Sequence, residues 1–270
     1  MELWPISLIV AAFSALAPVA AAAQDAAPAA GAWSEGKLSA ARLIAGGARS
    51  AGVEISLKGA AHTYWRNPGD SGAPPVFDFS ASKNLASATP RFPAPRRVSE
   101  DGLEVFAYVG DVVLPIDVAP RDPAQPVDLA LDLRYAACDR ICVPVEAKLA
   151  LRLPPGATTA DPALTSALAA LPKPIGADGP RVEIKPTTGS AKPTWTVRFE
   201  PPLDAAADLF SDAAEGWFFG TKRNSGGGFD LTLEQKPDGA PSSVDITLVV
   251  ADDARALETT VSLDVGGSKP

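Results

Sequence analysis

The sequence predicts an all-β protein that consists of two antiparallel β-sandwich domains. Its 270 residues exceed the usual size of a single domain. Short segments in which apolar and polar residues alternate recur along the chain, and Pro and Gly separate them roughly every 8–12 residues. A proline-rich stretch at 156–180 interrupts this pattern once, so we place the boundary between the two domains there.

An apolar segment at the N-terminus predicts a signal peptide over residues 1–23. Leu3–Ala17 is apolar, and the small residues Ala21–Ala23 that follow it form a cleavage pattern. Pro5 and Pro18 interrupt the apolar run, which leaves it shorter than the ~20 residues of a membrane-spanning helix. We therefore expect export to a compartment where disulfides persist, without stable membrane insertion.

The charge of the chain argues against a nucleic-acid partner. The formal net charge is −8, and the sequence contains no run of five or more basic residues. Proteins that bind nucleic acids or anionic membranes carry a basic patch or stripe instead.

The first predicted domain, residues 32–155, follows a leader at 24–31 that we expect to be disordered. In "GVEISLKG" the residues Val53, Ile55 and Leu57 alternate with polar neighbours, as in a half-buried strand. A turn is predicted at Asn67–Asp70. Further strands are predicted in "LEVFAYVG", "VVLPIDV", "VDLALDLRY" and "VEAKLALRL".

The linker at 156–180 contains one predicted short helix over 161–171, with Asp161 as its N-cap. The second predicted sandwich, residues 181–265, contains "WTVRFEP", "FDLTLEQ", "VDITLVV" and "TTVSLDV", and a tail at 266–270 follows it. Its glycine-rich loop, "NSGGGFD", leads into a strand pattern, so it is a hairpin connection and not a phosphate-binding loop.

Cys138 and Cys142, in "YAACDRICVP", are the only two cysteines and lie between two predicted strands. A three-residue hairpin loop would place them opposite each other, within the ~5.5–6 Å between Cα atoms that a disulfide requires. In the loop-entropy model, a disulfide that closes a ring of this size stabilises the fold by roughly 2 kcal/mol, so its structural contribution would be modest. A hairpin tip also exposes sulfur to thiolate attack, and Arg140 lies between the cysteines. Spacing alone leaves structural, redox and metal-binding roles open.

The metal-binding role would require a third ligand. His62, the only histidine, could complete a Cu(I) site with the two cysteines. A lone histidine in a strand is more often hydrogen-bonded to the backbone, and no Met-rich or His-rich tract supports metal handling. The primary hypothesis therefore includes no metal and no cofactor.

Several segments in order resemble one family. "HTYWRNPGDSGAPPVFDFSASKNL", "FPAP", "VVLPIDV" and "YAACDRICVPVEAKLALRLP" together look like the N-terminal periplasmic domain of the DsbD thiol:disulfide interchange family. The similarity is closest to the ScsB-type branch, which is linked to copper tolerance, and it covers about residues 32–155. Residues 181–265 resemble the second β region of that branch more loosely, through "AEGWFFG".

The resemblance implies an immunoglobulin-like fold and a redox role for Cys138 and Cys142. In the family this pair receives electrons from a membrane partner and passes them to oxidised periplasmic proteins. Pro144 and Glu146 match the family's C-x-P-x-E-A context. The family shields its disulfide with an aromatic cap, for which Phe106 and Tyr108 are candidates here, although both also fit as core aromatics.

We therefore expect a periplasmic thiol-disulfide exchange protein, with protein-disulfide reductase as its candidate enzyme activity. Full-length family members continue into a membrane domain and a thioredoxin-like domain, and this sequence ends at Pro270. A separate membrane-embedded thiol reductase of the DsbD/ScsB type is thus the expected electron donor. The alternative is a non-enzymatic module of a copper-tolerance system that binds copper, or a partner through "HTYWRNPGD".

Overall fold

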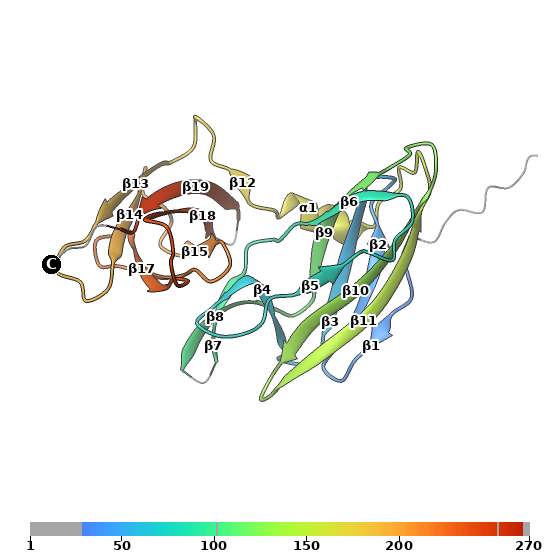
Figure 1. The fold of residues 1–270 in the computed structure, drawn as a ribbon, viewed down its shortest axis with the longest axis horizontal. Helices are drawn as coiled ribbons and strands as arrows, with labels where there is room; N and C mark the ends of the chain where they lie inside the picture. Colours follow the sequence, from blue (N-terminus) through green and yellow to red (C-terminus); the bar gives the residue numbers. More distant parts are fainter. Residues whose placement is uncertain (1–28, 101, 253, 267–270) are drawn as a thin grey trace, which may run out of the picture.

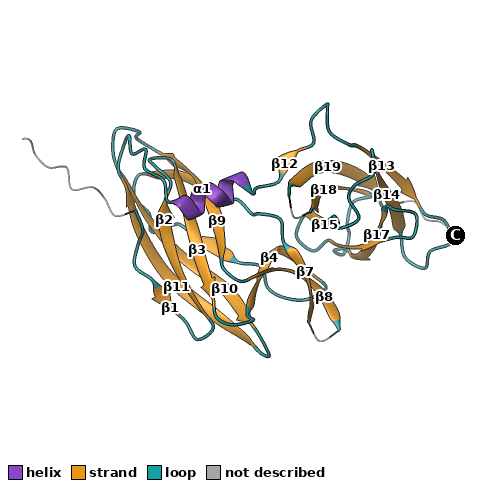
Figure 2. Ribbon diagram, turned by 180° about the vertical axis from the view of Figure 1, so that it is seen from behind, coloured by secondary structure: helices purple, strands orange, loops and turns teal. Residues whose placement is uncertain are grey.

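The computed structural model describes residues 29–100, 102–252 and 254–266, and it is built almost entirely of β-strands. Four sheets and one short helix account for its regular structure, which confirms the predicted all-β class (Figures 1 and 2). Two sheets come from the N-terminal half of the chain and two from the C-terminal half. The predicted signal peptide at 1–23 lies outside the described residues.

The N-terminal half forms two antiparallel sheets that share one core. The first sheet has the order β1 (Ser34–Glu35), β2 (Ser39–Ala45), β3 (Ser50–Leu57), β9 (Val112–Pro120), β6 (Leu85–Pro90). The second has the order β11 (Cys142–Leu153), β10 (Val127–Cys138), β4 (His62–Gly69), β8 (Leu103–Val109), β7 (Arg96–Glu100), and β5 (Val76–Asp78) pairs with β10.

The large apolar residues of the predicted strand "VDLALDLRY" are buried in β10, and the residues between them are more exposed. Its odd-numbered residues face the core and are at most 5% exposed: Val127, Leu129, Leu131, Leu133 and Tyr135. Successive side chains of a strand point to opposite faces, so this pattern sets which face of β10 is buried. Tyr135 also forms a 2.8 Å hydrogen bond with the hydroxyl of Ser39 on β2, which ties the two sheets together.

The C-terminal half repeats the two-sheet arrangement around a second core. One sheet has the order β12 (Lys173–Pro174), β19 (Ala256–Asp264), β18 (Ser243–Ala251), β15 (Asp208–Ala213). The other has the order β13 (Arg181–Pro186), β14 (Thr194–Glu200), β17 (Phe229–Gln235), β16 (Phe218–Arg223). The large aromatic side chains of this core are Trp195, Phe199, Trp217, Phe219 and Phe229.

The predicted helix is present as α1 (Pro162–Ala169), and Asp161 caps it by accepting a 2.8 Å hydrogen bond from the amide of Ala163. Leu164 of α1 is fully buried. Its methyl groups lie 2.6 Å and 3.0 Å from the positions that a Cβ would take at Gly46 and Gly52. These two glycines are therefore needed so that the helix can approach the sheet closely.

The stretch predicted as a linker is attached to both halves of the molecule. Ala160 forms an isolated β-bridge with Gly46, and β12 pairs in parallel with β19. In the ribbon view, α1 lies beside the N-terminal sheets and leads directly into β12 (Figure 2). Residues 156–180 therefore connect the two halves and form backbone pairings with both of them.

Two local predictions differ from the structure. Residues 29–31 of the leader that we expected to be disordered pair with β2, through a bridge between Ala30 and Ile44. The turn predicted at Asn67–Asp70 is mostly part of β4, which continues to Gly69 after an irregular register beyond Tyr64. In both places hydrogen bonds to a neighbouring strand outweigh the local sequence preference. Within the described residues, no helix is long and apolar enough to cross a membrane.

A polar clasp joins the two halves. The Arg97 side chain on β7 donates hydrogen bonds of 3.0 Å and 2.9 Å to Asp208 on β15, and further bonds to the Leu209 carbonyl and the Thr221 hydroxyl. It also pairs with Glu104 at 3.0 Å. Such multiple charge-assisted bonds hold a guanidinium in one orientation.

Apolar contacts surround this clasp. Phe210 of β15 packs edge-on against Phe106, with 5.1 Å between ring centroids, and against Trp65 at 6.3 Å. Phe210 therefore belongs to the core of the N-terminal sheets, although it comes from the C-terminal half. A second ion pair, Arg66 to Asp212 at 2.7 Å, lies beside it.

We predict that Arg97→Met lowers the free energy of unfolding by about 2 kcal/mol, because it leaves a partly buried Asp208 without its charged partner. Arg91→Met is the matched control, since the pair of Arg91 with Asp117 is exposed and such pairs contribute less than ~1 kcal/mol. Urea denaturation of both variants measures the difference. Equal losses of stability would contradict a structural role for the clasp.

Candidate functional site

The β10–β11 hairpin places the two cysteines directly opposite each other. Cys138 ends β10, Cys142 begins β11, and the register of all twelve residue pairs in the hairpin leads to this pairing. The sulfurs form a disulfide, with 4.0 Å between the Cα atoms, which is closer than the separation expected from the sequence. The three-residue loop of Asp139–Ile141 closes the hairpin, as predicted.

The two cysteine residues differ in burial. Cys138 is fully buried and packs with Tyr64, Val105 and Ala107. Cys142 is exposed and lines a cleft at the surface. A nucleophile from solvent can therefore approach the disulfide from the side of Cys142.

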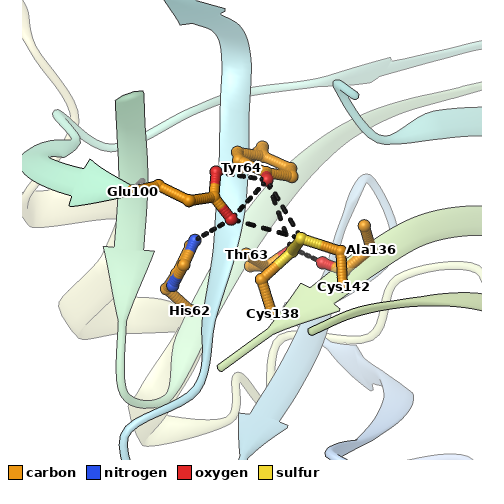
Figure 3. The surroundings of a disulfide bond; sticks show 7 residues. All are labelled: His62, Thr63, Tyr64, Glu100, Ala136, Cys138 and Cys142. Atoms are coloured by element: carbon orange, nitrogen blue, oxygen red, sulfur yellow. Dashed lines mark hydrogen bonds and ion pairs between the residues drawn. A yellow bond between two sulfur atoms is a disulfide. The ribbon is translucent and has the colours of Figure 1, made fainter. Parts of the chain in front are cut away.

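Tyr64 and Glu100 lie against the disulfide (Figure 3). The phenol oxygen of Tyr64 is 3.3 Å from the Sγ atoms of both cysteines, and it donates hydrogen bonds of 3.1 Å and 2.8 Å to Oε1 and Oε2 of Glu100. Glu100 Oε1 is also 3.2 Å from Cys142 Sγ. A hydroxyl and a carboxylate are thus positioned at the sulfur of the exposed cysteine, Cys142.

His62 forms the remaining side of the site. It faces Cys138 in the pairing of β4 with β10, and its ring lies edge-on to Tyr64. The His62 side chain is only 7% exposed, and its Nε2 lies 3.7 Å from Glu100 Oε1. This nitrogen is buried and has no hydrogen-bond partner among the described residues.

A cleft of about 420 Å³ opens beside Cys142. It is lined by residues of the hairpin loop, of β4 and of β7, which include His62, Glu100, Arg140 and Ile141. Ile141 is 62% exposed, which is unusual for a large apolar side chain. Arg140 is exposed and lines this cleft.

The candidate cap residues are core residues instead. Phe106 is 1% exposed and Tyr108 is 7% exposed, and both belong to the main core of the N-terminal sheets. Tyr108 donates a 2.8 Å hydrogen bond to the Pro93 carbonyl and does not reach the disulfide. Pro144 and Glu146 are exposed on β11, two and four residues beyond Cys142.

Sequence reasoning did not identify Glu100, and it named Tyr64 only as part of a docking segment. Glu100 lies at the end of β7 and is 42 residues from Cys142, and nothing in its local sequence marks it as functional. Only the pairings of β7 with β8, of β8 with β4 and of β4 with β10 bring it to the sulfurs.

Comparison with known proteins identifies the first half of the chain. Residues 34–154 match the family model described as the N-terminal domain of the thiol:disulfide interchange protein DsbD. These residues are similar to the N-terminal domain of DsbD. The match spans the two N-terminal sheets and includes Cys138 and Cys142. It confirms the resemblance to the DsbD and ScsB proteins seen in the sequence.

A solved structure extends the comparison to most of the chain. The N-terminal periplasmic domain of ScsB from Proteus mirabilis is similar with a TM-score of 0.69 and 18% sequence identity. The alignment covers 87% of this chain and 98% of that one, so the similarity in fold reaches into the C-terminal sheets. The all-β arrangement agrees with the immunoglobulin-like fold expected for this family. Among curated protein sequences, none matches the chain.

The environment of the tyrosines leads to a pH prediction. The chain has three tyrosines, and burial raises the pKa of Tyr64, Tyr108 and Tyr135, with Glu100 adding to the effect at Tyr64. A tyrosine whose pKa is higher in the folded chain than in the unfolded chain adds to the free energy of unfolding. This contribution is fully present at pH values below the unfolded pKa of about 10, and it is lost as the pH rises above that value.

We therefore predict that stability falls above a pH of about 10 and that tyrosinate forms only as the chain unfolds. Ultraviolet absorbance of tyrosinate, recorded together with circular dichroism during an alkaline titration, tests this. The urea-unfolded chain is the control and should titrate near pH ~10. A tyrosine that ionises near this pH in the folded protein would contradict the prediction.

Proposed function

We propose that this protein carries out thiol-disulfide exchange at the Cys138–Cys142 pair, with Cys142 as the cysteine that forms bonds to partners. The observation that supports this most directly is that Cys142 is an exposed residue beside a cleft, whereas Cys138 is fully buried. The family match supports a role in thiol-disulfide interchange generally. A purely structural disulfide would not require a hydroxyl and a carboxylate beside it.

Reduction of the pair begins at Cys142. A thiolate of the donor attacks Cys142 Sγ, the bond between the two cysteines breaks, and Cys138 leaves as a thiolate. The Tyr64 hydroxyl, 3.3 Å from Cys138 Sγ, can stabilise this negative charge if its proton turns from Glu100 towards the sulfur. A second donor thiol then displaces Cys142, so the donor becomes a disulfide and the pair gains two electrons and two protons.

Transfer to a substrate reverses these steps. Cys142 loses its proton, for which Glu100 Oε1 is an acceptor within reach, and attacks the substrate disulfide. A mixed disulfide forms and one substrate thiolate leaves. Cys138 then attacks Cys142 Sγ, which restores the internal disulfide and releases the substrate as a dithiol.

The partners follow from this chemistry. We propose that the donor is a membrane-embedded thiol reductase of the DsbD/ScsB type, that the acceptors are oxidised periplasmic proteins, and that the protein acts in the periplasm. The similarity to a domain described as periplasmic supports this location. The cleft beside Cys142, with the exposed Ile141 on its rim, offers a surface where a partner's own cysteine can approach.

Single-cysteine variants test the order of attack. In Cys138→Ala, we expect Cys142 to react with glutathione disulfide and to accumulate a stable glutathione adduct, measured by mass spectrometry. In Cys142→Ala, the buried Cys138 should react at least about tenfold more slowly, because a thiol reacts according to its access and ionisation. The wild-type couple should have a reduction potential above about −300 mV in a glutathione buffer.

Both variants unfolded in urea serve as the control and should react at similar rates. If the folded variants also reacted equally fast, the assigned order of attack would be wrong. A potential far below that of exchange proteins, together with no adduct in either variant, would reject exchange as the function.

A further inference from the structure

Four donor groups of the kinds that bind metal ions meet at the disulfide. They come from four strands: His62 from β4, Glu100 from β7, Cys138 from β10 and Cys142 from β11. Ligand atoms of His62, Glu100 and Cys138 all lie within 4.8 Å of one another. Cys142 Sγ adds a fourth donor, 3.2 Å from Glu100 Oε1.

The unpartnered nitrogen of His62 points to a ligand. A buried polar atom without a hydrogen bond is costly, and the proposed exchange steps do not use His62. Its Nε2 is directed towards Glu100 Oε1 at 3.7 Å, which is too long for a hydrogen bond (Figure 3). Two ligands of one tetrahedral zinc ion are separated by a similar distance, given metal–ligand bonds of about 2.0–2.3 Å.

We propose that the reduced form of this protein binds one Zn²⁺ through Cys138, Cys142, His62 and Glu100. In the first step a dithiol donor gives two electrons and two protons to the disulfide and is itself oxidised to a disulfide. In the second step Zn²⁺ binds and displaces the two thiol protons. The oxidised form has no thiolates, so the site exists only after reduction.

The donor set favours zinc over copper. Two thiolates, one imidazole and one carboxylate are four ligands of the types found in tetrahedral zinc sites, whereas a carboxylate does not suit the soft ion Cu(I). The spacing of the cysteines, with three residues between them, falls within the range of zinc-binding cysteine pairs. This differs from the Cu(I) site considered from the sequence, which did not include Glu100.

Tyr64 orients the carboxylate for this role. Its hydroxyl donates a 2.8 Å hydrogen bond to Oε2, while Oε1 faces His62 and Cys142. Hydrogen bonds from neighbouring groups commonly orient metal ligands in this way. The cleft beside Cys142 gives the ion a path from solvent.

Bound zinc would also regulate exchange, because it occupies both sulfurs. This consequence rests on the proposed function, whereas the metal site itself requires only that the disulfide can be reduced. Zinc binding and thiol-disulfide exchange can therefore succeed or fail separately.

The full chain is reduced with a phosphine, freed of reductant without oxygen, and titrated with Zn²⁺ in competition with a chromophoric chelator. We expect one Zn²⁺ per reduced chain and none for the oxidised protein. His62→Ala and Glu100→Gln should each weaken binding by about tenfold or more. Glu146→Gln, an exposed carboxylate on β11, is the matched control and should bind as the wild type does.

Folding of each variant is checked by circular dichroism and by re-formation of the disulfide, so that lost binding is not mistaken for unfolding. Zinc should also slow the reaction of the reduced wild type with glutathione disulfide, and slow Glu100→Gln less at the same concentration. Absence of binding to the reduced wild type would overturn the proposal. Equal affinities for Zn²⁺ in the wild type, His62→Ala and Glu100→Gln would also overturn it, because the site would then consist of the sulfurs alone. Tight Cu(I) binding without Zn²⁺ binding would overturn it for the same reason.

Discussion

The register of the β10–β11 hairpin is the constraint on which the rest of the site depends. Twelve consecutive residue pairs run from Val127 and Leu153 at one end to Cys138 and Cys142 at the other. The leucines of this hairpin fill the core, and their alternation determines which face of each strand is buried. The burial pattern and the position of the cysteines are therefore consequences of the same pairing.

Because the hairpin is held by its own hydrogen bonds and by the core, its fold does not rely on the disulfide. A bond that closes so small a ring contributes only roughly 2 kcal/mol through loop entropy. The scaffold can thus keep its shape while the sulfurs change oxidation state. The two cysteines differ mainly in burial, since Cys138 packs in a buried cluster with Tyr64, Val105 and Ala107 and Cys142 is exposed.

Local patterns predicted the elements of the fold well, and long-range pairing explains what they missed. Alternating residues predicted β10 and β11, Asp161 predicted the start of α1, and the cysteine spacing predicted a hairpin tip. Glu100 could not be predicted, because its approach to Cys142 results from three strand pairings and not from its own neighbours in sequence. The docking of Phe210 into the N-terminal core was missed for the same reason.

The polar contacts between the two halves involve strands on only one side of the site. In the part of the chain that the structure describes, the hydrogen bonds and ion pairs across the junction come from Arg66 on β4 and Arg97 on β7. These strands carry Tyr64 and Glu100, while the sulfurs lie on strands that the clasp does not touch. The C-terminal half therefore supports the strands that position Tyr64 and Glu100. Damage to it would displace these two side chains before it altered the bond between the sulfurs.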